Sequence, residues 1–292
     1  MIPRPYQGHA AMLLFSALVA GSFSLGAKLG DLISPTAINA VRFWIAAAII
    51  AGIAMARGGI PLTTFRAPWR YLILGGFFSI YFVMMFEGLK TAAPVSAAAV
   101  FTLTPIMSGF FGWLLLRQVM TPRIAFALAV GGAGAIWVIF RGNITALLSL
   151  DIGKGELIYF WGCVSHAIYT PMVRKLNRGE SAIHFTLGML LAGGLVLTIW
   201  AWGDIRTTDW VHLPSIVWIT LFYTAIFASA ATFVLLQFAT LRLPSSKVMA
   251  YTYLTPSWVI LWQLSLGESA PSAIVLIGFA ATIGALLLLL KE

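Results

Sequence analysis

The chain has 292 residues, of which 60% are hydrophobic and only 9% are charged, and its mean hydropathy is +0.95. This composition excludes a water-soluble globular domain. The formal net charge of +9 comes from lysines and arginines that are scattered over short loops. We therefore predict a membrane protein with no nucleic-acid partner. Its positive charges indicate which side of the membrane each loop lies on.

The apolar residues form segments of about 20 residues, which is the length that a helix needs to cross a bilayer core of roughly 30 Å. These segments predict an all-α polytopic membrane protein surrounded by lipid. In chain order, the ten predicted transmembrane helices are 10–29, 36–56, 69–90, 94–116, 122–140, 155–175, 182–202, 214–238, 246–266 and 271–290.

The basic residues are distributed unequally between the two sets of connecting loops. If the N-terminus is cytoplasmic, twelve of the 18 lie on that side: Arg4, Arg57, Arg66, Arg70, Arg117, Arg123, Arg174, Lys175, Arg178, Arg242, Lys247 and Lys291. Five lie on the opposite side: Lys28, Lys90, Arg141, Lys154 and Arg206. Short loops follow the positive-inside rule, so we predict cytoplasmic termini in a bacterial inner membrane.

One stretch of the chain is repeated. Leu103-Thr104-Pro105 and Leu254-Thr255-Pro256 stand at an offset of 151 residues (105 to 256), and in each copy a proline, an apolar helix and a polar turn follow in the same order. This pattern indicates a duplication, with repeats at 1–146 and 147–292 within one integrated transmembrane domain.

The number of spans in each copy gives the duplication a mechanical meaning. Five is an odd number, so the second copy must enter the membrane from the opposite side, and the two copies are predicted to be inverted repeats. Inverted repeats can exchange conformations about an axis in the membrane plane, which opens a midplane site to alternate sides.

Prolines lie about halfway along two predicted spans. Pro105 and Pro256 each remove a backbone donor, which frees the carbonyls of Phe101 and Thr252. In lipid this loss is tolerated only against protein or a water-filled cavity. The prolines therefore predict two kinked central helices that line a pore, and ordinary packing kinks are the alternative. Pro171 should loosen the span 155–175 in the same way.

Two predicted spans carry small residues at spacings of four. Ala127, Gly131 and Ala135 lie in the fifth span, and Ala280 and Gly284 lie in the tenth. Such faces allow close helix packing in membranes. These spans are expected to brace the bundle or a dimer, so we expect a monomer or a weak homodimer.

The repeated Leu-Thr-Pro helices, the run Ala40 to Trp44, the run Leu266 to Glu268 and ten spans in two halves resemble the drug/metabolite transporter superfamily, EamA-type. The chain looks most like a bacterial aromatic amino-acid exporter. The resemblance implies export of amino acids or related metabolites, and a cavity between helices one, three, four, six, eight and nine. The first half has Leu116-Arg117-Gln118 where the second half has Leu266-Gly267-Glu268, so the carboxylate is not repeated. We therefore interpret Glu268 as a loop or cap residue.

His166 is the strongest candidate for a substrate contact, because a polar group inside a membrane is costly and is commonly functional. It lies about 16 Å into the sixth span at 1.5 Å per residue, close to the midplane. Tyr169 follows at i+3 on the same face. A histidine that is hydrogen-bonded within the bundle is the alternative. Neutral imidazole can donate and accept, which suits a zwitterion, and its protonation could couple transport to pH.

Several other side chains occur at comparable depths. The further candidates for substrate binding are Tyr81 and Met85, which share one face of the third span, and Tyr223, Tyr251 and Trp258 in the eighth and ninth spans. Aromatic residues in spans commonly serve packing instead. If these face one cavity, its apolar wall suits an aromatic or large aliphatic side chain.

Three charged residues lie near the predicted outer face. Lys28, Arg42 and Glu87 could form an outer vestibule that engages the carboxylate and ammonium of a substrate. The alternatives are that Lys28 and Arg42 extend toward the interface, and that Glu87 pairs with Lys90 at the helix end.

The sequence also bears on the class of function. There is no Walker loop for phosphate binding, Cys163 is the single cysteine, and His9, His166, His184 and His212 are dispersed along the topology. We therefore predict no metal, no cofactor and no enzyme activity. A channel has less need of inverted repeats. The predicted function is a secondary transporter or facilitator of amino acids, with export of drugs or other small metabolites as the alternative.

Overall fold

The computed structural model describes residues 4–119, 121–140, 142–148, 152–269 and 272–290, and all regular secondary structure within these ranges is helical. The basic residues Arg141 and Lys291, and Pro271 at the start of the tenth predicted span, lie outside the described residues. Arg4 is described by its backbone only.

The described residues of the first half of the chain form eight helical elements: α1 (Arg4–Ala27), α2 (Pro35–Ala56), the 3₁₀ helix η1 (Leu62–Phe65), α3 (Trp69–Gly88), α4 (Pro94–Phe101), α5 (Thr104–Leu116), α6 (Pro122–Ile139) and the short α7 (Ile144–Leu148). The predicted division between 146 and 147 falls inside α7.

The second half contains α8 (Lys154–Leu176), α9 (Ala182–Trp200), the short α10 (Trp202–Thr207), α11 (Ser215–Ala225), the π-helical η2 (Ile226–Ala231), α12 (Thr232–Thr240), α13 (Ser245–Ala250), the 3₁₀ helix η3 (Tyr251–Leu254), α14 (Thr255–Ser265) and α15 (Ala273–Leu290).

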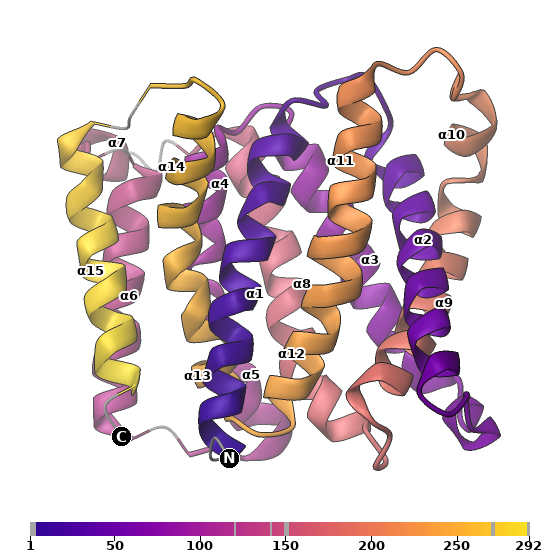
Figure 1. The fold of residues 1–292 in the computed structure, drawn as a ribbon. Helices are drawn as coiled ribbons and strands as arrows, with labels where there is room; N and C mark the ends of the chain where they lie inside the picture. The colour runs from indigo at the N-terminus through magenta and orange to yellow at the C-terminus, as the bar shows by residue number, and fades with distance from the viewer. Residues whose placement is uncertain (1–3, 120, 141, 149–151, 270–271, 291–292) are drawn as a thin grey trace.

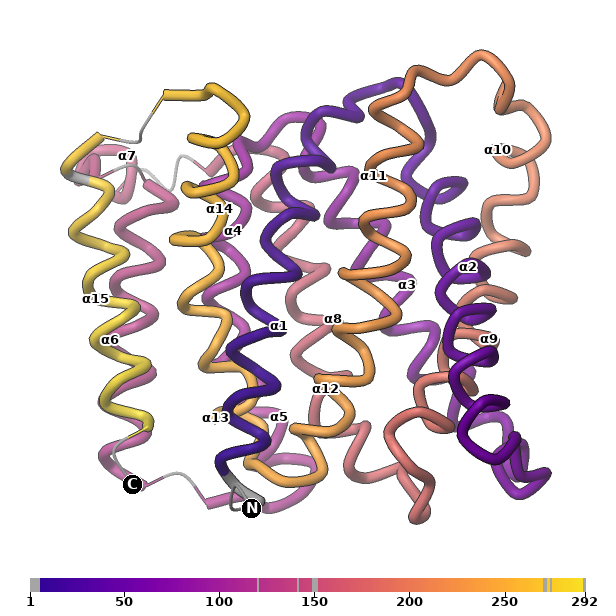
Figure 2. Tube along the Cα trace, in the orientation of Figure 1, coloured from indigo at the N-terminus to yellow at the C-terminus, as the bar shows by residue number. Residues whose placement is uncertain are grey.

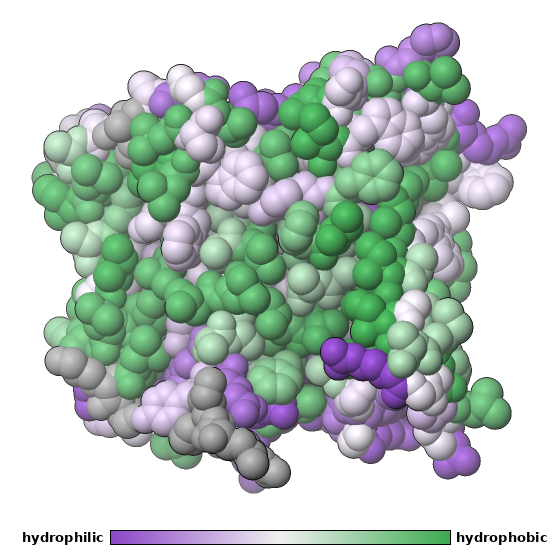
Figure 3. Space-filling view, viewed as in Figure 1, coloured by the Kyte–Doolittle hydropathy of each residue, from purple (hydrophilic) through white to green (hydrophobic). Residues whose placement is uncertain are grey.

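Helices of membrane-spanning character dominate this arrangement. Within the described residues, seven helical segments are long and apolar enough to cross a membrane: 6–27, 35–56, 69–88, 94–116, 122–139, 182–200 and 215–240. The apolar helix Val275–Leu290 is shorter. The protein is therefore an all-helical, multi-pass membrane protein. Figure 3 shows the matching surface, with a hydrophobic band between hydrophilic ends.

Three of the predicted spans are not single α-helices. The span at 94–116 is divided into α4 and α5, the span at 214–238 contains η2, and the span at 246–266 is divided by η3. The first and third divisions come directly before Pro105 and Pro256, so each proline lies in the first turn of a new helix rather than inside a kinked one. The missing N–H costs least at this position.

The helices stand side by side in one bundle, with both termini at the same end (Figures 1 and 2). α2 and α9 pack together at one edge of the bundle, and α6 and α15 pack together at the other. Between these pairs, α1 packs against α12 and α14, while α8 packs against α3 and α5. The central helices are thus enclosed by protein on several sides.

The pair α6 and α15 uses small residues, but only in part those predicted. Ala127 and Ala135 of α6 are fully buried. On α15, Ala280 is exposed and a Cβ at Gly284 would meet no atom within 4 Å, so the predicted face does not make the contact. Gly278 makes the close contact with α6 instead. Its carbonyl oxygen lies 2.6 Å from the position that a Cβ atom on Gly134 would occupy.

Candidate functional site

The middle of the bundle is filled by aromatic rings from several helices. Each of these side chains is at most 2% exposed, and each has a neighbouring ring within the group. We refer to the following residues as the central aromatic cluster: Phe78, Tyr81 and Phe82 of α3, Phe101 of α4, Tyr159, His166 and Tyr169 of α8, and Phe233 of α12.

His166 lies within this cluster. Its ring centroid is 4.6 Å from that of Tyr81, 5.1 Å from that of Phe78 and 5.5 Å from that of Phe101. Tyr169 lies one turn further along α8, and its ring is tilted by 34° against that of Phe78 at a centroid distance of 3.9 Å. The structure therefore brings together three of the residues predicted to bind substrate, namely His166, Tyr169 and Tyr81.

The polar atoms of the cluster are incompletely paired. The hydroxyls of Tyr81 and Tyr159 lie 3.1 Å apart, and Gln237 Nε2 of α12 donates to the Tyr169 hydroxyl at 2.8 Å. His166 Nδ1 and Gln237 Oε1 are both buried and have no hydrogen-bond partner among the described residues. Unpaired polar atoms are costly in a buried site, so these two are candidates for ligand contacts.

Arg42 of α2 adjoins the cluster on the side of Phe82. Its guanidinium carbon lies 3.8 Å from the Phe82 ring centroid. Nε donates to Ser229 Oγ at 2.6 Å, Nη1 to Asn39 Oδ1 at 3.1 Å and Nη2 to the Ala228 carbonyl at 2.8 Å. Arg42 is fully buried, so it does not extend to the interface. Its guanidinium makes no ion pair in the part of the chain that the structure describes.

Two of the three acceptors of Arg42 come from the π-helix η2. A π-helical turn is wider than an α-helical one and is common at functional sites. Here it presents the Ala228 carbonyl and the Ser229 hydroxyl to the guanidinium. The hydrogen bonds therefore join α2 of the first half to the segment between α11 and α12 in the second half.

The first Leu-Thr-Pro motif contacts the 3₁₀ helix η3, which leads into the second motif, next to the cluster. Thr104 at the start of α5 lies 3.3 Å from Thr252 of η3, measured between hydroxyl oxygens, and also donates to the Phe101 carbonyl. Phe101 itself contacts His166. The ends of two half-helices thus lie beside the candidate site.

Pro171 does not interrupt α8, which runs unbroken from Lys154 to Leu176. A proline at this position leaves the Ala167 carbonyl without its helical donor. The hydroxyl of Ser108 on α5 lies 3.5 Å from this carbonyl oxygen and donates to it. Pro171 thus brings α5 and α8 into polar contact.

Three other predicted binding residues make their polar contacts with α1 and not with the central aromatic cluster. Tyr223 donates to the Leu18 carbonyl at 2.9 Å, and Trp258 Nε1 donates to Ser16 Oγ at 3.2 Å. The hydroxyl of Tyr251 pairs with His9 Nδ1 at 3.0 Å. All three partners belong to α1, so these side chains form a second group. Met85 is fully buried in the hydrophobic core.

The three charges of the predicted vestibule have different partners and different exposure. Lys28 lies 3.4 Å from Glu268 Oε1, and its side chain is 37% exposed. Glu87 lies 3.0 Å from Lys90, as the pairing alternative predicted. Among the described residues, Arg42 makes an ion pair with neither Glu268 nor Glu87, and its side chain is fully buried. The structure therefore does not place Lys28, Arg42 and Glu87 around one accessible vestibule.

Sequence reasoning missed several members of the site. Phe78, Phe101, Tyr159 and Phe233 have no feature that separates them from ordinary apolar residues. Gln237 did have a signal, because it is a polar residue inside a predicted span, as His166 is. It lies next to the predicted end of that span.

Comparison with known proteins points to one family. A sequence model of the EamA-like transporter family matches the chain twice, at residues 7–140 and 153–291. The uncharacterized transporter YyaM of Bacillus subtilis (strain 168) is 25% identical over 265 residues, which cover 89% of this chain and 86% of that protein. A crystal structure of a protein with 21% sequence identity has the same fold, with a TM-score of 0.73 over 98% of this chain and 97% of that one.

Proposed function

The chain belongs to the EamA-like transporter family, and on that premise we propose that it exports amino acids, aromatic and other neutral ones, and related metabolites by alternating access. It is a membrane transporter of small solutes rather than an enzyme. We propose the substrate class, the direction of transport and the residues that bind substrate.

The proposed architecture is ten transmembrane helices in two inverted repeats, with both termini in the cytoplasm of a bacterial cell. Two observations support it. The family model matches each half of the chain separately. The packing is also mirrored, because α1 contacts α12 and α14 while α8 contacts α3 and α5, the counterparts of those helices in the other repeat. Such repeats provide two equivalent arrangements around one central site.

The central aromatic cluster is the observation that carries the proposed substrate class. Its aromatic wall with few polar atoms is the usual constitution of a small-molecule site, and it suits an aromatic or large aliphatic side chain. His166 Nδ1 and Gln237 Oε1 are unpaired and could engage a substrate ammonium or amide hydrogen.

Arg42 is the proposed partner for the substrate carboxylate. Its present acceptors are a hydroxyl, an amide oxygen and a carbonyl, all of them neutral. A buried cation is most stable with an anionic partner, and a guanidinium can hold a carboxylate through two parallel hydrogen bonds. Since Arg42 stacks on Phe82, the carboxylate would lie next to the aromatic wall.

Alternating access requires the cluster to open, since His166 is only 1% exposed in this structure. The interruptions at residues 102–103 and 251–254 divide two spans into half-helices beside the cluster. We propose that these interruptions are the hinges, because the ladder of backbone hydrogen bonds is weakest there. A wall with few polar atoms would also admit other apolar metabolites or drugs, which is the second candidate function.

Flux measurements in proteoliposomes test this proposal. Purified protein would be assayed with labelled tryptophan, phenylalanine, leucine and a cationic aromatic drug, each with and without an imposed pH gradient. We expect flux of at least one aromatic or neutral amino acid above that of protein-free vesicles. Flux of the drug alone would favour the second candidate, and no amino-acid flux would contradict the first.

A further inference from the structure

We propose that the chain binds an anionic phospholipid at the end of the bundle that carries both termini. The lipid phosphate would lie in a basic pocket of about 330 Å³, and an acyl chain would lie in an adjoining groove. No residue of the central aromatic cluster lines either site, and neither site depends on the substrate. The pocket is lined by Thr63, Arg66, Arg70, Arg178, Gly179 and Glu180, from the α2–α3 and α8–α9 connections and the start of α3 (Figure 1).

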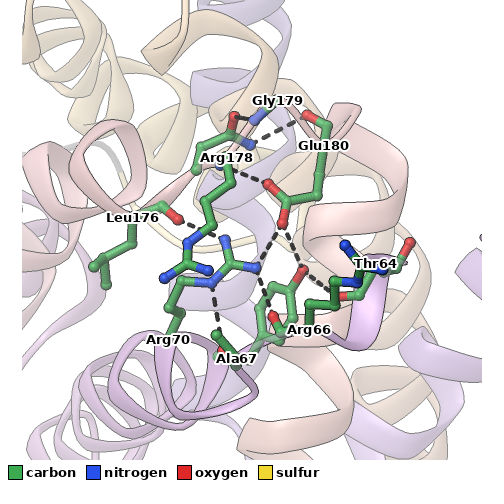
Figure 4. Close-up of polar contacts among 10 residues, drawn as sticks. Thr64, Arg66, Ala67, Arg70, Leu176, Arg178, Gly179 and Glu180 are labelled. Carbon is green, nitrogen blue, oxygen red and sulfur yellow. Dashed lines mark hydrogen bonds and ion pairs between the residues drawn. The ribbon is translucent and has the colours of Figure 1, made fainter. Parts of the chain in front are cut away.

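Arg70 forms the wall of the pocket. Its side chain is 1% exposed, and it donates to the carbonyls of Leu176, Arg66 and Ala67 at 2.6, 2.8 and 3.3 Å. Nη2 also donates to Glu180 Oε1 at 2.6 Å (Figure 4). These contacts use all three nitrogens of the guanidinium, so Arg70 holds the pocket together instead of serving as a free ligand.

Glu180 is committed to the same wall. While one carboxylate oxygen accepts from Arg70, the other accepts from the backbone N–H of Arg178 at 2.6 Å. Partial burial alone raises the pKa of this carboxyl, but the hydrogen bonds from Arg70 and the backbone hold the pKa below its usual value. Glu180 is therefore an anion that neutralises Arg70.

Two positive charges remain uncompensated in the pocket. Arg66 and Arg178 are exposed. Among the described residues, neither guanidinium makes a hydrogen bond or an ion pair. Guanidinium groups bind phosphate oxygens through paired hydrogen bonds, and basic pockets between transmembrane helices bind anionic lipid headgroups. The charge of the pocket thus fits a phosphate group.

The adjoining groove distinguishes a lipid from a soluble phosphate. It has a volume of about 370 Å³ and is lined by apolar side chains, including Phe65 and Leu72 on one side and Leu191 and Leu195 of α9 on the other. Tyr71 links the groove to the pocket, because its ring lines the groove while its hydroxyl lies 3.5 Å from Oε1 of Glu180, which lines the pocket. An apolar groove beside a cationic pocket matches the two parts of a phospholipid.

Native mass spectrometry of the purified chain tests the site. The protein would be titrated with phosphatidylglycerol, with phosphatidylcholine of the same acyl chains and with inorganic phosphate. We expect phosphatidylglycerol to bind tightest. The double variant Arg66→Gln/Arg178→Gln should lose about tenfold or more in that affinity, since each basic residue contributes electrostatic attraction. The control Arg117→Gln/Arg123→Gln removes the same charge from exposed positions outside the pocket.

Three results would overturn the assignment. Equal phosphatidylglycerol affinity in the pocket and control variants would remove the pocket from lipid binding. Equal affinity for both lipids would remove the role of charge. Binding of inorganic phosphate as tight as that of phosphatidylglycerol would replace the lipid with a soluble anion. If the double variant does not fold, Arg178→Gln alone gives the same comparison, because the backbone N–H that binds Glu180 remains.

Discussion

The hydroxyl oxygens of Thr104 and Thr252 lie 3.3 Å apart, where the interruptions of two membrane helices meet. Thr104 also donates to the carbonyl of Phe101, the group that Pro105 leaves without a helical donor. Because the Thr104 hydrogen is used in this way, the Thr252 hydroxyl donates to Thr104. Thr252 stands four residues before Pro256, as Phe101 stands before Pro105. By the offset of 151 residues Thr252 is the counterpart of Phe101, so the contact joins the two helix interruptions without pairing equivalent residues.

Replacing these threonines with valine should reveal the contact. Thr104→Val removes two hydrogen bonds and should lower the free energy of unfolding by about 1–2 kcal/mol. Thr252→Val removes one and should cost about half as much. Denaturation of the purified protein in detergent measures both. The double variant should cost less than the sum of the single variants, and strict additivity would show that the pair does not interact.

His166→Ala should lower substrate flux in proteoliposomes by roughly tenfold or more, since it removes a polar group from the proposed binding site. Folded yield and melting temperature should remain close to those of the wild type. His212→Ala is the matched control, because His212 lies on an exposed loop paired with Asp209. Wild-type kinetics in His166→Ala would remove this residue from the site.

Arg42→Met should separate substrates by their carboxylate. We expect transport of tryptophan to fall far more than transport of tryptamine, which lacks the carboxylate that Arg42 is proposed to bind. Competition between the two labelled compounds in the same vesicles measures the ratio. Arg42→Lys, which keeps the charge but not the paired donors, should give an intermediate ratio. An equal loss for both substrates would assign Arg42 to structure alone.

Gly75→Ala should destabilise the contact between α3 and α9. A Cβ at Gly75 would stand 2.5 Å from the backbone nitrogen of Gly193, and that backbone cannot move aside as a side chain could. Overpacking of this kind costs about 1–3 kcal/mol. Gly76→Ala is the control, since a Cβ there meets nothing within 4 Å and alanine favours the helix by about 0.5–1 kcal/mol. Thermal unfolding that ranks the two variants equally would contradict the close approach.

Glu180 should make stability depend on pH in the acid range. Its pKa is lowered in the folded state, so its contribution is fully present above the unfolded value and is lost as the pH falls through the folded value. Melting temperatures measured from neutral pH downward should therefore fall below about pH 4.3, the ordinary glutamate value. Glu180→Gln should melt lower at neutral pH and show a weaker acid dependence. An unchanged acid dependence would show that other carboxyls control it.

Much of the helical layout could be predicted from hydropathy and proline positions. The segments at 36–56, 69–90 and 182–202 correspond closely to α2, α3 and α9, because a continuous apolar run of that length must form a helix in lipid. His166 could be selected in advance because a histidine in such a run is exceptional. The internal structure of the predicted eighth span could not be predicted, because the π-helix η2 is made of ordinary small and apolar residues.

The sequence by itself determined that this chain is a helical membrane protein, where its apolar segments lie and which polar residues inside them needed an explanation. Only the tertiary structure decided which of those residues meet: His166 and Tyr81 share one aromatic cluster, Tyr223 and Trp258 donate to α1, and Arg42 has two of its three acceptors on η2. The physical reason is that lipid and protein interior are equally apolar, so hydrophobic pattern cannot distinguish the two faces of a helix. Hydrogen bonds and ring contacts between distant segments make that distinction.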